Sequence, residues 1–285
     1  MRKLVLLLLG ISLLAVSVAA QTGVWVVNSN QNIFERVGNG WNMKSGKARD
    51  IGVGANGSVW MIGTNRVGGG YGVYRWNGRS WVGVPGGGVR IDVGRNGDPW
   101  LVNSAGQIYH RVGRNWQRLP GLARDIGVGS NGSVWIIGRN KVAGGYGIYR
   151  WNGRNWLRVP GGAVRIDVDS SGVPWIVNSG GLIFRRRGST WQTLPGRARD
   201  IGVGAAGTWV IGLNKVAGGY GIHRWDGTRW RSVPGGATEI SVGSRNTVTP
   251  PQVIRINGPL VVNSNQNIFA RVGNGWRVMP GRAKD

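Results

Sequence analysis

Three segments of the sequence carry the same polar and aromatic side chains at the same spacing. Each has an Asn followed by Arg or Lys and then Val, and a Tyr-Gly pair follows a glycine-rich stretch. An amide can pair with adjacent sugar hydroxyls, a cation can meet a carboxylate or phosphate, and tyrosine offers a flat apolar face with a polar tip. The alternative is structural, with the tyrosine packed in the core and the asparagine capping a turn. The three sets that we expect to contact a ligand are Asn65/Arg66/Tyr71, Asn140/Lys141/Tyr146 and Asn214/Lys215/Tyr220.

These sets lie inside a repeat that runs through nearly the whole chain. One tryptophan returns at spacings of alternately about 35 and 40 residues, and a seventh copy has Leu260 in its place. Periods of this size indicate a solenoid, a propeller or an array of units. The recurring residues are Trp25, Trp60, Trp100, Trp135, Trp175 and Trp209.

One repeat, residues 123–161, has the pattern of four short strands. Apolar and β-branched runs are separated by turns, and Asn152-Gly153 is a strong hairpin signal. A β-solenoid coil is usually shorter and lacks such hairpins, whereas four strands in about 40 residues are typical of a propeller blade. We therefore predict an all-β fold, a single β-propeller of four-stranded antiparallel blades over residues 21–285. Seven units are present, the first and last incomplete, so we expect six to seven blades.

An up-and-down blade places its loops at two ends. The first-to-second and third-to-fourth strand turns are short and rich in Asn-Gly, while the other connections are longer and more varied. Because function tends to lie on loops presented by a rigid scaffold, the longer-loop end is the expected working surface. Five arginines between blades lie at this end and could form a positive rim, or could instead pair with an adjacent Asp such as Asp125. They are Arg49, Arg90, Arg124, Arg165 and Arg199.

The chain is strongly basic, and its first 20 residues resemble a secretory signal. Arg2 and Lys3 precede an apolar run, with small residues before Gln21. The run is shorter than the roughly 20 residues of a membrane span, so we expect cleavage after Ala20, an extracellular location and no membrane insertion. The net charge is +25, and without the two basic residues of the signal 34 Lys+Arg against 11 Asp+Glu give +23. Such a chain should concentrate at anionic surfaces.

The repeated motif resembles that of the tectonin family, which includes tachylectin-type and fish-egg lectins. The matching pattern, G-x-A-x-D-I-x-V-G-x-x-G-x-V-W, then I-[YF]-R, a second Trp and V-P-G, recurs through residues 22–285. The resemblance implies a secreted or surface-exposed propeller that binds carbohydrate, typically bacterial lipopolysaccharide or other non-self glycans, and agglutinates microbes. Members commonly have six blades.

The two ends of the repeat array depart from this pattern. The first unit lacks its first strand, and the seventh carries an insert at residues 245–255. Residues 25–41 and 260–276 differ at only two of 17 positions, as a recent duplication or an imperfect gene prediction would explain. If a C-terminal strand completes the first blade, only residues 283–285 are present to begin it.

Two further residue sets have both a structural and a functional interpretation. The recurring tryptophans are predicted to pack in the core, and a second set is predicted to pack between blades rather than to form sugar platforms. Asn56 and Asn131 begin glycosylation sequons, and hairpin chemistry explains the same residues. The second tryptophan set comprises Trp41, Trp81, Trp116, Trp156, Trp191, Trp230 and Trp276.

Three other functions were weighed against a lectin. Glycoside hydrolysis uses paired carboxylates, or Tyr with Glu, and the only glutamates, Glu35 and Glu239, lie in different strand contexts. The chain has no Cys and no clustered His, so we expect no metal, no cofactor and no enzymatic activity. A basic matrix protein that coats an anionic surface by charge alone remains the alternative. A signal peptide argues against nucleic acid as the partner, and the sequence leaves the oligomeric state open.

Overall fold

The structure, a computed structural model, describes residues 21–243, 260–262, 267–272 and 275–282. Every regular element in these residues is a β-strand, as predicted. The chain divides into two compact units, residues 1–247 and residues 248–285. No helix in the described residues is long and apolar enough to span a membrane. The predicted signal peptide, residues 1–20, and the insert at 245–255 lie outside the described residues.

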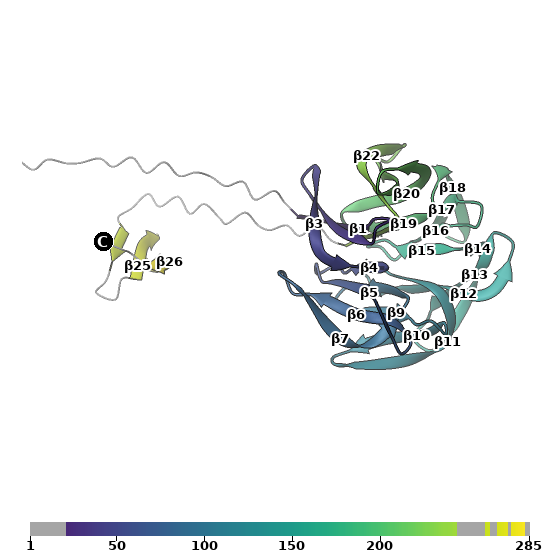
Figure 1. Cartoon of the computed structure of the whole chain (residues 1–285), viewed down its shortest axis with the longest axis horizontal. Coiled ribbons are helices and arrows are strands. Elements are labelled where there is room, and N and C mark those ends of the chain that lie inside the picture. Colours follow the sequence, from purple (N-terminus) through teal and green to yellow (C-terminus); the bar gives the residue numbers. More distant parts are fainter. Residues whose placement is uncertain (1–20, 244–259, 263–266, 273–274, 283–285) are drawn as a thin grey trace, which may run out of the picture. The chain divides into compact units, whose positions relative to one another are not determined.

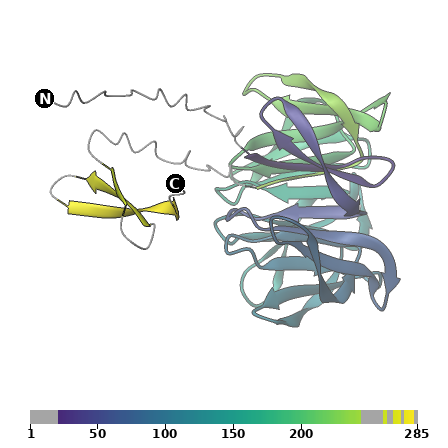
Figure 2. The same ribbon diagram turned by 60° about the vertical axis from the view of Figure 1, so that its left-hand side comes forward.

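The first unit is a β-propeller of six blades, each a four-stranded antiparallel meander (Figures 1 and 2). Blade 1 consists of β23 (Glu239–Val242), β1 (Gln21–Val27), β2 (Asn32–Val37) and β3 (Gly40–Lys47). Blade 2 consists of β4 (Asp50–Val53), β5 (Val59–Val67), β6 (Gly70–Trp76) and β7 (Trp81–Gly88). Blade 3 consists of β8 (Arg90–Val93), β9 (Pro99–Val102), β10 (Gln107–Val112) and the first part of β11 (Asn115–Val128).

The strand β11 continues into blade 4, so these two blades share one long strand. Blade 4 adds β12 (Val134–Val142), β13 (Gly145–Trp151) and β14 (Trp156–Ala163). Blade 5 consists of β15 (Arg165–Val168), β16 (Pro174–Val177), β17 (Leu182–Arg187) and β18 (Thr190–Arg197). Blade 6 consists of β19 (Asp200–Gly204), β20 (Gly207–Val216), β21 (Gly219–Trp225) and β22 (Trp230–Ala237).

The ring closes through a strand that the sequence pattern did not single out. The inner strand of blade 1 is β23, which pairs antiparallel with β1 from Val24↔Val242 to Val27↔Glu239. The sequence predicts this strand after the last repeat, beginning at residues 283–285, which lie outside the described residues. Instead the first strand of the seventh unit supplies the backbone partner that β1 lacks. The ring of residues 21–243 therefore has six blades, which decides between six and seven.

The second unit contains a three-stranded antiparallel sheet. It consists of β24 (Leu260–Val262), β25 (Asn267–Val272) and β26 (Gly275–Arg282), with Leu260 paired to Ala270. The structure thus differs from one continuous propeller over residues 21–285. The physical reason is that the inner strand of the seventh repeat, β23, is already part of blade 1.

The core consists of six apolar clusters, one at each blade interface. At the interface of blades 4 and 5, Trp135 and Ile137 of β12 pack against Ile166 and Val168 of β15. The six recurring tryptophans are 3–8% exposed, which confirms the prediction that they pack in the core. Burying an indole removes about 150–250 Å² from water, so these residues contribute a large share of the apolar contact between blades in a chain without disulfides.

Candidate functional site

The longer-loop end of the ring carries three rigid hairpins, one on each even-numbered blade. In blade 2 the hairpin joins β5 to β6, with Arg66 paired to Tyr71 and the turn at Gly69, whose φ is 84°. The Gly69 carbonyl accepts a 2.9 Å hydrogen bond from the Ser104 amide of blade 3. Ser179 and Ser29 make the same bond to the hairpins of blades 4 and 6. Each hairpin is therefore fastened to the following blade.

One face of each predicted ligand-binding tyrosine ring is covered by an arginine. The guanidinium of Arg49 lies 4.2 Å from the ring centroid of Tyr71. Arg124 over Tyr146 and Arg199 over Tyr220 repeat this stack at 4.2 and 4.1 Å. The arginines themselves are exposed. Three of the predicted rim arginines thus lie against three of the tyrosines predicted to contact a ligand, and each forms an Arg–Tyr pair.

The predicted asparagines are held by the adjacent strand. The Asn65 side-chain oxygen accepts a 2.9 Å hydrogen bond from the Tyr74 hydroxyl, and Asn140 accepts one of 2.8 Å from Tyr149. Asn214 lies 3.3 Å from a ring nitrogen of His223. These bonds orient the amide, whose nitrogen has no partner among the described residues. The adjacent cations Arg66, Lys141 and Lys215 are exposed.

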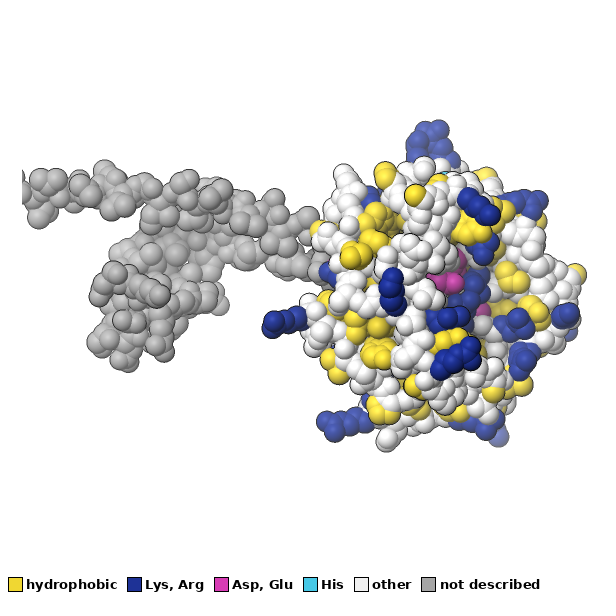
Figure 3. All heavy atoms as spheres, in the orientation of Figure 1, with side chains coloured by type: hydrophobic (Ala, Val, Ile, Leu, Met, Phe, Trp, Pro, Cys, Tyr) yellow, Lys and Arg dark blue, Asp and Glu magenta, His cyan; other side chains and the backbone are white. Residues whose placement is uncertain are grey.

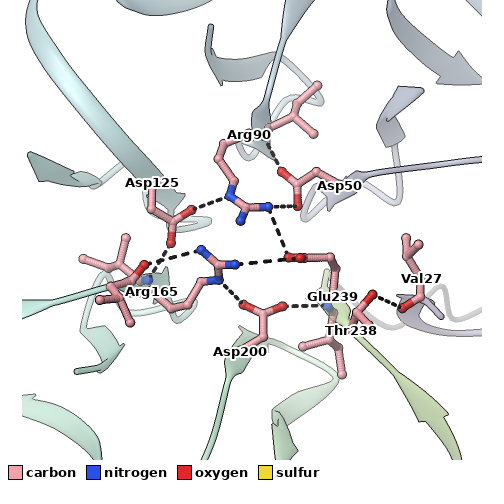
Figure 4. A network of polar contacts seen from close by, with 12 residues as sticks. Val27, Asp50, Arg90, Asp125, Arg165, Asp200, Thr238 and Glu239 are labelled. Carbon is pink, nitrogen blue, oxygen red and sulfur yellow. Dashed lines mark hydrogen bonds and ion pairs between the residues drawn. The ribbon is translucent and has the colours of Figure 1, made fainter. Parts of the chain in front are cut away.

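The other two predicted rim arginines point into the central channel (Figure 4). Arg90 lies 3.5 Å from Asp50, 3.7 Å from Asp125 and 3.2 Å from Glu239. Arg165 lies 3.3 Å from Asp200 and 3.7 Å from Glu239. The prediction of a five-arginine rim is therefore corrected to three exposed arginines and two ion-paired ones. The physical reason is a shift in the repeat: in blades 3 and 5 the arginine occupies the inner-strand position that Asp occupies in blades 2, 4 and 6.

The channel carboxylates also hydrogen-bond the blades to one another. Asp50 accepts a 2.7 Å bond from the Ile91 amide of the next blade, and Asp92 accepts one of 2.6 Å from Val128. One such bond crosses each of the six interfaces. The remaining four run from Ile166 N to Asp125, Val203 N to Asp167, Ile240 N to Asp200 and Val53 N to the Ser241 hydroxyl.

Burial governs the ionisation of these groups. It raises the pKa of Asp92 to about 7, even though two backbone N–H groups favour its charged form. Burial and the nearby Glu239 raise the pKa of Asp200 to about 7. The pKa of Asp125 is also raised by burial, against the opposing effect of Arg165 and Arg90. Below these groups, six valines close the channel at its shorter-turn end, from Val53 round to Val242.

A cleft of about 320 Å³ opens on the longer-loop end between blades 3 and 4. Arg124, Tyr146 and Arg139 form one wall, and the turn at Asn103 forms another. The Arg139 guanidinium donates a 3.0 Å hydrogen bond to the Ala105 carbonyl. Arg90 and Arg165 lie at the channel side of the cleft. Blades 2 and 6 have the same Arg–Tyr pair, but there Glu239 replaces one of the two neighbouring channel arginines.

The charges of the ring are separated between inside and outside. Of the 11 acidic residues in the chain, six line the channel: Asp50, Asp92, Asp125, Asp167, Asp200 and Glu239. On the face shown in Figure 3, acidic side chains are visible only in the central hollow, and basic ones are spread around it. The outer surface is thus more basic than the net charge indicates.

The second tryptophan set packs between blades, as predicted. Each of the six in the ring donates its indole N–H to a backbone carbonyl of the preceding blade, at 2.7–2.9 Å. The donors are Trp41, Trp81, Trp116, Trp156, Trp191 and Trp230. The side chain of Trp276 lies outside the described residues.

Both sequon asparagines are exposed at turns. The Asn56 side chain accepts a 3.0 Å hydrogen bond from the Ser58 amide, and Asn131 accepts one of 2.9 Å from Ser133. Asn131 also donates to the Ser171 carbonyl at 3.0 Å. These contacts are the hairpin chemistry that the sequence offered as the alternative, and glycosylation stays a prediction.

A set of arginines at the shorter-turn end was not among the predicted site residues. Arg75 and Arg111 lie 5.8 and 5.9 Å from the ring of Trp60, and all three line a hollow of about 840 Å³. The signal was present as an arginine in the even-blade segments V-Y-R-W, I-Y-R-W and I-H-R-W, and as Arg36, Arg111 and Arg186 near the end of the corresponding strand in odd blades. Among the described residues, no group of three or more His, Cys, Asp or Glu is arranged to hold a metal.

Comparison with known proteins identifies the repeat. The family model described as "Tectonin domain" matches residues 12–110, 87–187 and 163–250. No curated protein matches the sequence.

Among solved structures, "YCF48 bound to D1 peptide" is 16% identical, with a TM-score of 0.46 and 89% of each chain covered. YCF48 from Cyanidioschyzon merolae is 16% identical, with a TM-score of 0.44 and 86% and 87% covered. A protein of unknown function from Bacteroides caccae is 10% identical, with a TM-score of 0.48; the match covers 76% of this chain and 97% of that one. Similarity at this level does not transfer a ligand or a partner.

Proposed function

The chain belongs to the tectonin family, and on that premise we propose that it is a secreted, multivalent lectin. Its ligand would be bacterial lipopolysaccharide or another anionic surface glycan of non-self origin. The observation that carries the proposal is the threefold repetition, at one end of the ring, of an exposed arginine on tyrosine beside an oriented amide. The proposal includes no enzymatic activity and no cofactor.

The chemistry of each cleft suits an acidic sugar. The Asn140 amide is held by Tyr149, so its nitrogen can donate to a ring hydroxyl without losing much side-chain entropy. Arg124 is exposed and lacks a carboxylate partner among the described residues, so its planar fork can pair with a carboxylate or phosphate. Lys141 would add a second cation.

Three hairpins with the same Arg–Tyr pair support binding to a repetitive surface. Individually weak sites can gain a factor of about 10²–10⁴ in avidity when several bind at once. The hydrogen bonds that fasten each hairpin to the next blade keep the three sites in fixed positions, so little ordering is needed on binding. The basic outer surface would also speed encounter with an anionic envelope.

The carboxylates argue against hydrolysis as an additional activity. Buried Glu35 lies 2.7 Å from Lys44, and Glu239 lies in the channel beside Arg90. Each glutamate is thus occupied by a cation in a different part of the ring, whereas glycoside hydrolysis uses two carboxyl groups on either side of one bond.

The second candidate is a matrix protein that coats an anionic surface by charge alone. The separation of acidic residues into the channel, with basic ones outside, favours it. Salt distinguishes the two candidates, because exposed charges are screened beyond about 8 Å at physiological ionic strength and beyond shorter distances above it.

The test is binding of purified protein to lipopolysaccharide and a glycan array at about 0.15 M and, for stronger screening, about 0.5 M salt. A lectin keeps binding at the higher salt and is displaced by a particular free sugar. Replacing Arg49, Arg124 and Arg199 together by Ala should lower that sugar-competed binding by a factor of about 10² or more, as multivalency is lost. Replacing three outer-strand arginines, Arg118, Arg158 and Arg231, is the charge-matched control.

Binding that disappears at the higher salt and ignores free sugars would establish the matrix protein instead. Secretion is tested separately, by N-terminal sequencing of protein recovered from the medium. A mature chain that begins at Gln21 supports it, and a retained Met1 contradicts it.

A further inference from the structure

The shorter-turn end of the ring, opposite the sugar clefts, repeats an arrangement of two arginines and a tryptophan. At the interface of blades 2 and 3, Arg75 and Arg111 lie 5.8 and 5.9 Å from the Trp60 ring. Arg75 is opposite Trp60 in the β5–β6 pairing, and Arg111 is opposite Trp116 in the β10–β11 pairing. The two guanidinium groups therefore approach each other from adjacent blades and line the same hollow of about 840 Å³.

The same positions recur at the other two even-to-odd interfaces. Arg150 lies 5.8 Å from Trp135, and Arg186 of blade 5 lies 5.1 Å from Trp191. At the interface of blades 6 and 1, Arg224 lies 5.7 Å from Trp209 and Arg36 lies 5.1 Å from Trp41. At each of the three interfaces the even blade thus contributes an arginine beside a buried indole, and the odd blade contributes one beside a half-buried indole. At blades 2 and 3 both arginines contact the same indole, Trp60.

Donors at two of these interfaces, those of blades 2–3 and 4–5, have no acceptor among the described residues. Nη1 of Arg111 and Nη1 of Arg186 are buried and have no hydrogen-bond partner among the described residues. The buried indole N–H of Trp135, which lies beside Arg150, is also without a partner. An unsatisfied buried donor costs about 1–3 kcal/mol, and more when it is charged. Sites that keep such donors in matching positions are built for an acceptor from outside.

Electrostatics points the same way. Burial, and then the positive charges of Arg114 and Arg75, lower the pKa of Arg111. Burial and the charge of Arg224 lower the pKa of Arg36. In both cases like charges from adjacent blades face each other. The hollow at blades 2 and 3 is also lined by Asp98 and by Glu35, whose charge is paired with Lys44.

We propose that these three arginine pairs are binding sites for tetrahedral oxyanions, in the first place phosphate esters. Two guanidinium forks can surround one phosphate with parallel N–H···O bonds, which a carboxylate or chloride cannot match in number. In the hollow at blades 2 and 3, the anion would lie between Arg75 and Arg111, next to Trp60. The proposal goes beyond the lectin function, because it concerns the opposite end of the blades and needs no sugar cleft.

The test is calorimetric titration of the full chain with inorganic phosphate, at constant ionic strength in a chloride buffer. We expect about three sites per chain, with phosphate binding at least tenfold more tightly than chloride. Arg111→Gln should reduce the number to about two, and Arg111→Gln with Arg186→Gln to about one. Arg158→Gln, an equal change of charge on the exposed outer strand β14, should leave three.

Stability measurements separate a ligand site from a structural role. Because Arg111 lacks a partner for its buried Nη1, Arg111→Gln should not lower the melting temperature in chloride. Phosphate should raise the melting temperature of the parent protein more than that of the variant, since a ligand of the native state stabilises it. A variant that is equally destabilised in both buffers would show a structural arginine and overturn the proposal.

Two further experiments, competition with a phosphate ester and comparison of its affinity with that of inorganic phosphate, identify the source of the anion. Glucose 6-phosphate should compete with phosphate, and this competition should be lost in the double variant, whereas glucose should not compete. An ester that binds tenfold more tightly than inorganic phosphate assigns the sites to phosphorylated glycans or lipids, and equal affinity assigns them to the free anion.

If Arg158→Gln weakens phosphate binding as much as Arg111→Gln does, the binding is a non-specific charge effect and the proposal is contradicted. The outcome of the phosphate titration is independent of the sugar-binding test, because a protein that binds no glycan would still show the same number of phosphate sites per chain.

Discussion

The even-numbered and odd-numbered blades of the ring have the same four strands but contribute different parts to the molecule. Even blades carry the long hairpins with their Arg–Tyr pairs, and their inner strands begin with Asp50, Asp125 or Asp200. Odd blades have short turns there, and their inner strands begin with Arg90, Arg165 or Glu239. The charged groups of one type face those of the other around the channel (Figure 4).

Under the proposed function, the channel and the hairpins divide stability and recognition between them. The channel groups are buried and bonded to backbone of the next blade, so they hold the ring together. The hairpin arginines, lysines and asparagines are exposed, so they are free to meet a ligand, whereas the tyrosines are half-buried against the core. The following predictions test that separation.

The largest effect is expected at an even-blade channel carboxylate. Asp125→Ala removes the acceptor of the Ile166 amide and one counter-charge of the buried Arg90. Breaking a buried ion pair from one side costs about 3–5 kcal/mol. Urea unfolding should show that the free energy of unfolding falls by about this amount. A fall below about 1 kcal/mol, which is the range of an exposed ion pair, would mean that other contacts stabilise the blade interfaces.

The odd-blade carboxylates should make stability depend on pH. Asp92 keeps its proton up to about pH 7 in the ring, against a reference pKa of 3.8. Between these values the folded state binds more protons than the unfolded state, so the free energy of unfolding falls as pH rises through this window. The slope per carboxyl is at most about 1.4 kcal/mol per pH unit.

The control for that slope is Asp92→Asn, which keeps an oxygen acceptor but does not titrate. Its unfolding free energy, measured from pH 4.5 to 8, should fall less steeply than that of the parent protein. Equal slopes would mean that Asp92 is ionised throughout this range in the folded ring.

A smaller effect is expected at the one neutral group of the channel series. Ser241→Ala leaves the buried Val53 amide without its 2.9 Å partner, and no charge is lost. A buried N–H group without a hydrogen-bond partner costs about 1–3 kcal/mol. Because no charge is lost, the unfolding free energy should fall by an amount near the lower end of this range. The unfolding free energies of Ser241→Ala and Asp125→Ala are compared by chemical denaturation, and the difference between their losses gives the contribution of the charge. Equal losses in the two variants would mean that the charge contributes nothing to stability.

The smallest effect on stability is expected at a hairpin. Arg124→Gln removes an exposed cation from the Tyr146 ring, and such a contact is worth about 0.5–1 kcal/mol. Its melting temperature should therefore stay close to that of the parent, while its binding to a glycan surface falls. A large loss of stability with unchanged binding would contradict the separation of roles.

Much of the fold could be predicted because its signals are local and repeated. The Trp135 strand and the Asn152-Gly153 turn follow from apolar runs and hairpin chemistry, and six copies of the pattern predicted a propeller. The core position of the tryptophans followed from their place in continuous apolar strands.

The candidate site was predicted only in part, because pairing across blades is not written in any one repeat. The sequence placed Asn140, Lys141 and Tyr146 on one hairpin, but Arg124 on Tyr146 appears only once two segments are packed. The five rim arginines look alike in sequence. Yet Arg90 begins the inner strand β8 and faces Asp50 and Asp125, whereas Arg124 lies within β11, one residue before Asp125, and is exposed.

By itself the sequence determined the strands, the turns, the blade unit and the basic charge, since each depends on neighbouring residues or on composition. Only the tertiary structure decided that β23 closes the ring at six blades, that six acidic residues gather in the channel, and that Arg75 and Arg111 face each other. The physical reason is that closure brings together side chains tens to hundreds of residues apart, as when β1 pairs with β23. Their partners are selected by packing and charge around the ring rather than by spacing along the chain.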